Sequence, residues 1–160
     1  MAMLTVILFL QEELMNFLPN INFTILLMIL YAKVFGFAKS AMMITVYLLF
    51  DAIYMGSLSP IWTTGQWIAW MVIPLLICTV FRKMEDSLKL AFVGALCAFL
   101  YCWIMILPTM WVLHTPFIPY LMADIPFELL LAASSFLGIL LLYDPLKKML
   151  QKLMQTQPQS

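Results

Sequence analysis

The chain has 160 residues, of which 65% are hydrophobic and only 10% are charged, and its formal net charge is zero. A soluble domain is about 45–50% apolar and about 25% charged, so water would not tolerate this amount of apolar surface. The mean hydropathy of +1.03 therefore predicts an all-α integral membrane protein, and the zero net charge argues against nucleic acid as a partner.

Six apolar segments follow one another between charged and turn-forming residues. A helix needs about 20 apolar residues, and at least about 17, to cross ~30 Å of hydrocarbon. The first three segments are shorter, which predicts thin or tilted packing, or an irregular turn near Pro19 and Asn20. The six predicted transmembrane helices cover residues 3–18, 21–35, 40–55, 65–81, 88–107 and 120–143.

The connections between these segments are short, so the sequence predicts one domain. Residues 36–39 form a tight turn, residues 82–89 a charged loop, and residues 56–64 and 108–119 two turn-rich loops. The predicted six-helix domain spans residues 1–150, and the polar residues 151–160 are expected to form a disordered cytoplasmic tail.

The basic residues determine the predicted topology. With six spans, all of them fall on one side of the membrane together with the N-terminus, and the opposite loops carry no Lys or Arg. By the positive-inside rule both termini are cytoplasmic, in a multi-pass cell-membrane protein of the bacterial plasma-membrane type. The basic residues on this cytoplasmic side are Lys33, Lys39, Arg82, Lys83, Lys89, Lys147, Lys148 and Lys152.

Acidic residues within the predicted spans are the first functional signal. Glu12, Glu13, Asp51, Asp124 and Glu128 all fall in the outer half of the bilayer or near its outer surface. Intramembrane acids are costly and usually face a bundle interior or a wet cavity. For the two glutamates of the first helix we favour solvation at headgroup level, and for the other acids a place in a binding pocket.

Aromatic residues gather at the same level. An interfacial belt accounts for Trp62 and Trp111, whereas Trp67 and Trp70 are spaced for one helix face beside Gln66 and are expected to line a cavity. Acids and aromatic rings without a basic partner favour a small polar ligand with a cationic or donor-rich ring. The predicted substrate-binding residues are Asp51, Tyr54, Trp67, Trp70, Tyr101, Trp103, Asp124 and Glu128.

The remaining reactive residues give no signal of catalysis. Cys78, Cys97 and Cys102 lie in apolar runs without a CxxC or Cys/His spacing, so we interpret them as structural thiols rather than metal ligands. His114 stands alone in a Pro-bounded loop. The small residues around Gly94 are typical of close helix packing. No enzyme activity, metal or cofactor is predicted.

Several loose motifs over most of the chain resemble the S components of energy-coupling factor (ECF) transporters. The clearest are YLMADIPFE at residues 120–128 and LLYDPL at 141–146, with PNINFT at 19–24, YAKVFG at 31–36 and GSLSP at 56–60. The resemblance implies a non-catalytic six-helix subunit that captures a vitamin, vitamin precursor or similar micronutrient from outside. It also implies a transmembrane coupling subunit and two cytoplasmic ATPase subunits as partners.

One feature departs from that family. Its members commonly carry an Ala-x-x-x-Ala pattern in the first helix for docking the coupling subunit, but here Val6 stands where the second Ala is expected after Ala2. Two other function classes stay open. An intramembrane aspartyl hydrolase would require Asp51 and Asp124 to meet at about 3 Å, and an accessory structural membrane subunit would require no site at all.

Overall fold

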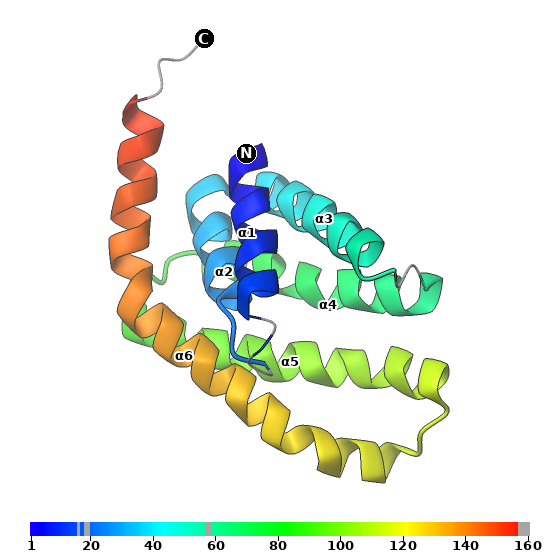
Figure 1. Cartoon of the computed structure of the whole chain (residues 1–160). Helices are drawn as coiled ribbons and strands as arrows, with labels where there is room; N and C mark the ends of the chain where they lie inside the picture. Colours follow the sequence, from blue (N-terminus) through cyan, green and yellow to red (C-terminus); the bar gives the residue numbers. More distant parts are fainter. Residues whose placement is uncertain (16, 18–19, 57–58, 157–160) are drawn as a thin grey trace.

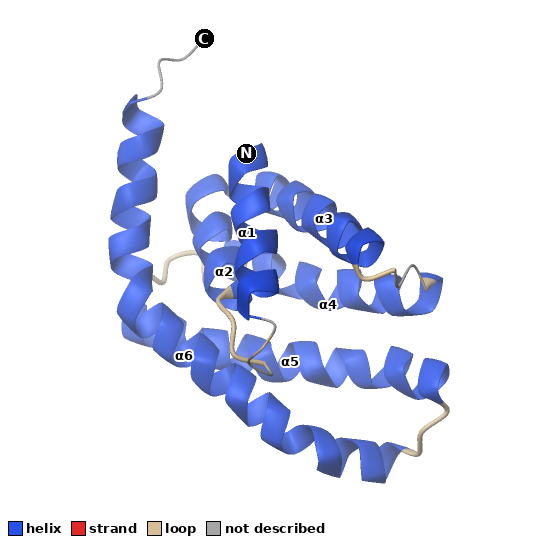
Figure 2. Ribbon diagram, viewed as in Figure 1, coloured by secondary structure: helices blue, strands red, loops and turns tan. Residues whose placement is uncertain are grey.

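The computed structural model describes residues 1–15, 17, 20–56 and 59–156, and over these residues its elements are helices joined by loops and turns, without a strand (Figures 1 and 2). The predicted all-α class is thus confirmed for the described part of the chain. The helices are α1 (Ala2–Met15), α2 (Thr24–Phe35), α3 (Phe37–Tyr54), α4 (Pro60–Cys78), α5 (Ser87–Leu113) and α6 (Phe117–Thr156).

Helix α2 is the centre of the fold. Its residues 24–32 are all buried, as expected for a helix that is apolar on every side. It contacts each of the other five helices, which follow one another around it in the order α1, α3, α4, α5, α6. Gly94 of α5 allows part of this packing, since a Cβ there would lie 2.1 Å from Ile139 of α6 and 3.6 Å from Ile29 of α2.

Four helices, α3 to α6, are long and apolar enough to cross a membrane. Their outward faces expose large apolar side chains, among them Phe50, Phe92, Leu107 and Leu141, which lipid tails would cover at no cost. Helices α1 and α2 have 14 and 12 residues, hence lengths of about 21 and 18 Å at 1.5 Å per residue. The chain is therefore compatible with a multi-pass membrane protein in which two helices are too short to span ~30 Å alone.

The predicted loop at residues 108–119 is wrong at its start, because helix α5 continues through Pro108 to Leu113. Proline removes one backbone hydrogen bond, but membrane helices tolerate this where neighbouring elements compensate. Pro108 is buried and lies against Gly65 of α4, where a Cβ would come within 2.6 Å of its ring. Only residues 114–116 connect α5 to α6, and His114 has a left-handed backbone with φ of 50°.

Helix α6 also extends beyond its predicted end at residue 143. It continues to Thr156, so residues 151–156 are helical where disorder was predicted, and residues 157–160 lie outside the described residues. Its orange part changes direction in Figure 1. Pro145 explains the bend, since it has no N–H for the carbonyl of Leu141.

Near the N-terminus and the 56–64 loop, part of each predicted turn falls on residues outside the described set. Pro19 and residues 57–58 belong there. Asn20 has a φ of 57°, a left-handed conformation that suits the predicted irregular turn. The turn at 56–64 is shorter than predicted, because Pro60 already occupies the first turn of α4, where its missing N–H costs nothing.

Two of the basic residues that oriented the chain, Lys33 and Lys147, contact the same loop of the fold. The ammonium group of Lys33, at the end of α2, donates hydrogen bonds to the carbonyl oxygens of Phe81 (2.8 Å), Arg82 (3.1 Å) and Met84 in the loop between α4 and α5. That same loop holds Glu85, which pairs with Lys147 of α6.

The Glu85 pair adds a pH-dependent contact at this end. The hydrogen bond from Lys147 holds the pKa of the Glu85 carboxyl below its usual range. Its contribution is present at neutral pH and is lost as the pH falls through the folded-state pKa.

We expect Lys33→Met to lower the free energy of unfolding by about 1–2 kcal/mol, because three carbonyl groups lose a charged donor. Lys39→Met is the matched control, since Lys39 lies in the first turn of α3 and is exposed. Denaturant titration of the detergent-solubilised protein measures both. Equal stability of the two variants would contradict a structural role for Lys33.

Candidate functional site

Glu12 is the centre of a polar cluster where three helices meet. Its carboxylate accepts hydrogen bonds from the Tyr47 hydroxyl of α3 and from Thr24 Oγ1 of α2, the latter at 3.3 Å. Tyr47 and Thr24 are both fully buried. Glu12 is therefore held inside the helix assembly, and our preference for headgroup-level solvation of this residue is wrong.

Gln11 completes this group of residues, which we call the Glu12 cluster (Gln11, Glu12, Thr24 and Tyr47). Its amide nitrogen donates to Thr24 Oγ1 at 2.8 Å, and its amide oxygen accepts from the backbone N–H of Phe23 at 2.9 Å. These bonds fasten the end of α1 to the start of α2. The Thr24 hydroxyl accepts a hydrogen bond from the Gln11 amide and donates one to the Glu12 carboxylate, so the direction of both hydrogen bonds is fixed.

Asp51 and Tyr54 flank this cluster on α3. Asp51 is half-buried, lies in electrostatic range of Glu12 and interacts with the side chain of Gln66 on α4. Tyr54 is exposed and places its ring edge-on to Phe9 of α1, with 5.5 Å between ring centroids. Of these two predicted site residues, Asp51 therefore lies toward the interior and Tyr54 at the periphery.

Trp67 and Trp70 of α4 do not share one cavity wall, although they are three residues apart. Trp70 is 2% exposed and stacks on Tyr101 of α5, with ring centroids 3.9 Å apart and an interplanar angle of 21°. Trp67 is 42% exposed and donates from its indole nitrogen to Thr45 Oγ1 at 3.0 Å. Trp70 therefore acts as a core residue that joins α4 to α5, and Trp67 faces a different space.

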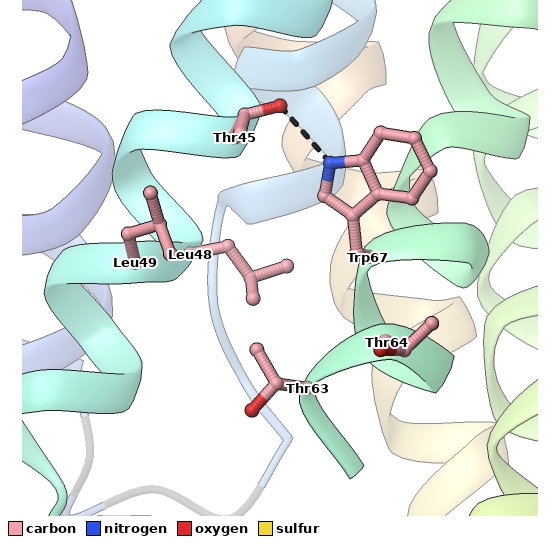
Figure 3. A pocket seen from close by; sticks show the side chains of 6 residues that line it. All are labelled: Thr45, Leu48, Leu49, Thr63, Thr64 and Trp67. Carbon is pink, nitrogen blue, oxygen red and sulfur yellow. Dashed lines mark hydrogen bonds between the residues drawn. The ribbon is translucent and has the colours of Figure 1, made fainter. Parts of the chain in front are cut away.

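Trp67 lines a shallow pocket between α3 and α4. The pocket has a volume of about 210 Å³, below the roughly 300–1,000 Å³ of most small-molecule sites. Figure 3 shows its apolar and hydroxyl-bearing walls, to which none of the predicted acids contributes. Its lining residues are Thr45, Leu48, Leu49, Thr63, Thr64 and Trp67.

A second polar group lies between α5 and α6, and we call it the hairpin cluster (Cys102, Asp124 and Glu128). Their thiol and carboxylate atoms all lie within 4.8 Å of one another. Asp124 and Glu128 are four residues apart on α6 and share a helix face. Trp103 is mostly exposed, and its side chain lies beside Glu128.

The acidic residues of the predicted site therefore separate into two groups. Asp51 belongs beside the Glu12 cluster, and Asp124 and Glu128 form the hairpin cluster, with the Trp70–Tyr101 stack joining α4 to α5. Three residues of the Glu12 cluster were not predicted from the sequence as site residues: Gln11, Thr24 and Tyr47. One usable signal existed for Tyr47, because it precedes Asp51 by four residues and so shares its helix face.

Comparison of the chain with protein-family models, with curated proteins and with solved structures gives no match. The class that fold and site define is an all-helical protein compatible with several membrane spans, in which acidic side chains lie between the helices.

Proposed function

We propose that this protein is the substrate-binding subunit of an ECF-type importer, with six membrane-embedded helices and both termini in the cytoplasm. It would capture a vitamin, vitamin precursor or related micronutrient from the medium and carry no catalytic activity. A transmembrane coupling subunit and two ATPase subunits would supply the energy for release inward.

The observation that carries the proposal is the distribution of charge between the two ends of the fold. Lys33, the 79–86 loop and Lys147 meet at one end. The carboxylates of Glu12, Asp51, Asp124 and Glu128 lie between helices. The parts of the sequence that carry these acids, residues 1–32, 40–81 and 90–146, contain no Lys or Arg. Acids without a cationic partner favour the binding of a ligand over a purely structural role.

The short helices α1 and α2 fit this proposal without spanning the bilayer alone. Backbone that is not helical is tolerated at membrane depth only when protein covers it. The segment after α1 is anchored by the bond from the Phe23 N–H to Gln11, and Ser134 of α6 donates to the carbonyl of Asn22 at 2.9 Å. Asn22 and Phe23 are therefore held from two sides, by α6 and by α1.

The alternative of an aspartyl hydrolase has less support. Asp51 neighbours Gln66, whereas Asp124 neighbours Cys102 and Glu128. A dyad requires two carboxyl groups to share a proton at about 3 Å, and these two aspartates have different partners. An accessory membrane subunit remains the third candidate.

Purification of the tagged chain, co-expressed with the coupling subunit and the ATPase pair of its source, tests the partner set. We expect all three partners to co-purify and ATP hydrolysis to appear in the complex. An unrelated multi-pass protein with the same tag is the control. Recovery of a well-behaved membrane-inserted chain without ATPase subunits would contradict the proposal.

Native mass spectrometry of the purified chain tests the binding site. We expect a co-purified organic molecule in the wild type and at least tenfold lower occupancy in Asp51→Asn and Glu128→Gln. Trp111→Ala is the control, because Trp111 is 73% exposed and far along α5. Unchanged occupancy in both acid variants would exclude these residues from the site.

A further inference from the structure

The hairpin of α5 and α6 brings together three metal-ligating side chains that are distant in sequence. The connection at residues 114–116 lies midway between Cys102 and Glu128, so the two residues face each other across the hairpin. Asp124 lies one helical turn before Glu128. The sulfur of Cys102 and one carboxylate oxygen of each acid lie within 4.8 Å of one another.

Glu128 is the second, independent sign of a ligand. It is 4% exposed, and its carboxylate oxygen Oε1 is fully buried with no hydrogen-bond partner. Buried carboxylates are stable only when they are paired with a cation, hydrogen-bonded or protonated. The charged group that acts on Glu128 is another acid, Asp124, and no cation among the described residues acts on it.

We propose that the hairpin cluster binds one divalent transition-metal ion of the zinc type. A thiolate is a soft ligand, which disfavours Mg²⁺ and Ca²⁺ and favours Zn²⁺, and Zn²⁺ also accepts carboxylate oxygens as ligands. Three protein ligands leave a fourth position of a tetrahedral ion for water or a further ligand. On binding, the Cys102 thiol forms a bond to the metal and releases its proton to solution.

The geometry requires only local adjustment. Zinc lies about 2.3 Å from sulfur and about 2.0–2.2 Å from oxygen, so ligand atoms around one ion are roughly 3.5 Å apart. The cluster must therefore contract by about 1 Å, which rotations of the Asp124 and Glu128 side chains can provide. Both carboxylates lie on consecutive turns of one helix, so their backbone positions are already fixed relative to each other.

This inference goes beyond the proposed function and does not depend on it. A metal bound at the hairpin cluster would involve Cys102, whose burial alone had favoured a purely structural thiol. It would also change the role of Asp124 and Glu128, from direct contacts with an organic ligand to metal ligands. Metal binding is measured on the isolated chain, whereas uptake requires the partner subunits.

Titration of the purified, detergent-solubilised full chain with Co²⁺ tests the proposal. We expect one Co²⁺ per chain, with a thiolate-to-cobalt charge-transfer absorption in the near ultraviolet that Zn²⁺ abolishes by competition. Cys102→Ser should remove this absorption, and Glu128→Gln and Asp124→Asn should each weaken Zn²⁺ affinity by roughly tenfold or more.

Cys97→Ser is the matched control, because Cys97 is a buried thiol on the same helix outside the cluster. It should retain full binding and the absorption. The nearly isosteric Glu128→Gln keeps the test decisive if Cys102→Ser fails to fold. Absence of stoichiometric Co²⁺ and Zn²⁺ binding by the folded wild type, or binding that both acid variants retain unchanged, would overturn the proposal.

Discussion

Replacing Trp70 by alanine should lower the free energy of unfolding by about 3–5 kcal/mol, the largest effect we expect from one substitution in this chain. The Trp70 side chain is almost completely buried and stacks on Tyr101. Its removal leaves a cavity between α4 and α5, and it also removes an aromatic pair worth about 0.5–1.5 kcal/mol beyond area burial. Reversible denaturant titration of the solubilised protein measures the change.

Two other tryptophans provide graded controls for this prediction. Trp67→Ala removes a half-exposed ring and its bond to Thr45, so we expect a loss of about 1 kcal/mol. Trp111→Ala removes an exposed ring and should change stability by about 0.5 kcal/mol or less. Trp70→Phe keeps a ring against Tyr101 and should lose less than half as much as Trp70→Ala. Similar losses for Trp70→Ala and Trp111→Ala would refute a core role for Trp70.

Hydropathy predicted six apolar segments and the described residues form six helices, because burial in lipid or protein demands apolar residues along the whole element. The same fact limits what the sequence reveals. Helix α2 is apolar because other helices surround it, whereas much of α6 is apolar on an exposed face. Composition cannot distinguish these two causes, so it could not show that α2 is central, although the shortness of its segment was visible in the sequence.

The predicted helix ends failed mainly at prolines. Pro108 and Pro145 both lie inside helices, although proline ends most helices in water. At Pro108 the reason is tertiary, because its ring packs against Gly65 on a neighbouring helix. No local pattern records that contact.

The candidate site was predictable in its residue types but not in its grouping. Acids stand out in an apolar sequence because their burial is costly. Which acids meet depends on how the helices pack, and this separates Asp51 from Asp124. Cys102 shows the limit most clearly, since its two acidic neighbours are more than twenty residues away and reach it only through the α5–α6 hairpin.

A double-mutant cycle between Glu12 and Tyr47 should give a coupling energy of about 1–2 kcal/mol. Glu12→Ala leaves the buried hydroxyl groups of Tyr47 and Thr24 without their acceptor, so we expect it to lose about 2–4 kcal/mol. Tyr47→Phe removes one donor to the carboxylate and should lose about 1–3 kcal/mol. The double variant should lose less than the sum, because the second substitution removes a group that the first has already left unpaired.

Glu13 is the matched control for this cycle. It is the next residue on α1, and its carboxylate oxygen Oε1 is buried without a hydrogen-bond partner. Glu13→Ala therefore removes an unsatisfied group and should be neutral or stabilising, and its coupling to Tyr47 should stay within about 0.5 kcal/mol. A coupling near zero for Glu12 as well would contradict a buried Glu12 cluster. It would favour solvation of the Glu12 carboxylate at headgroup level instead.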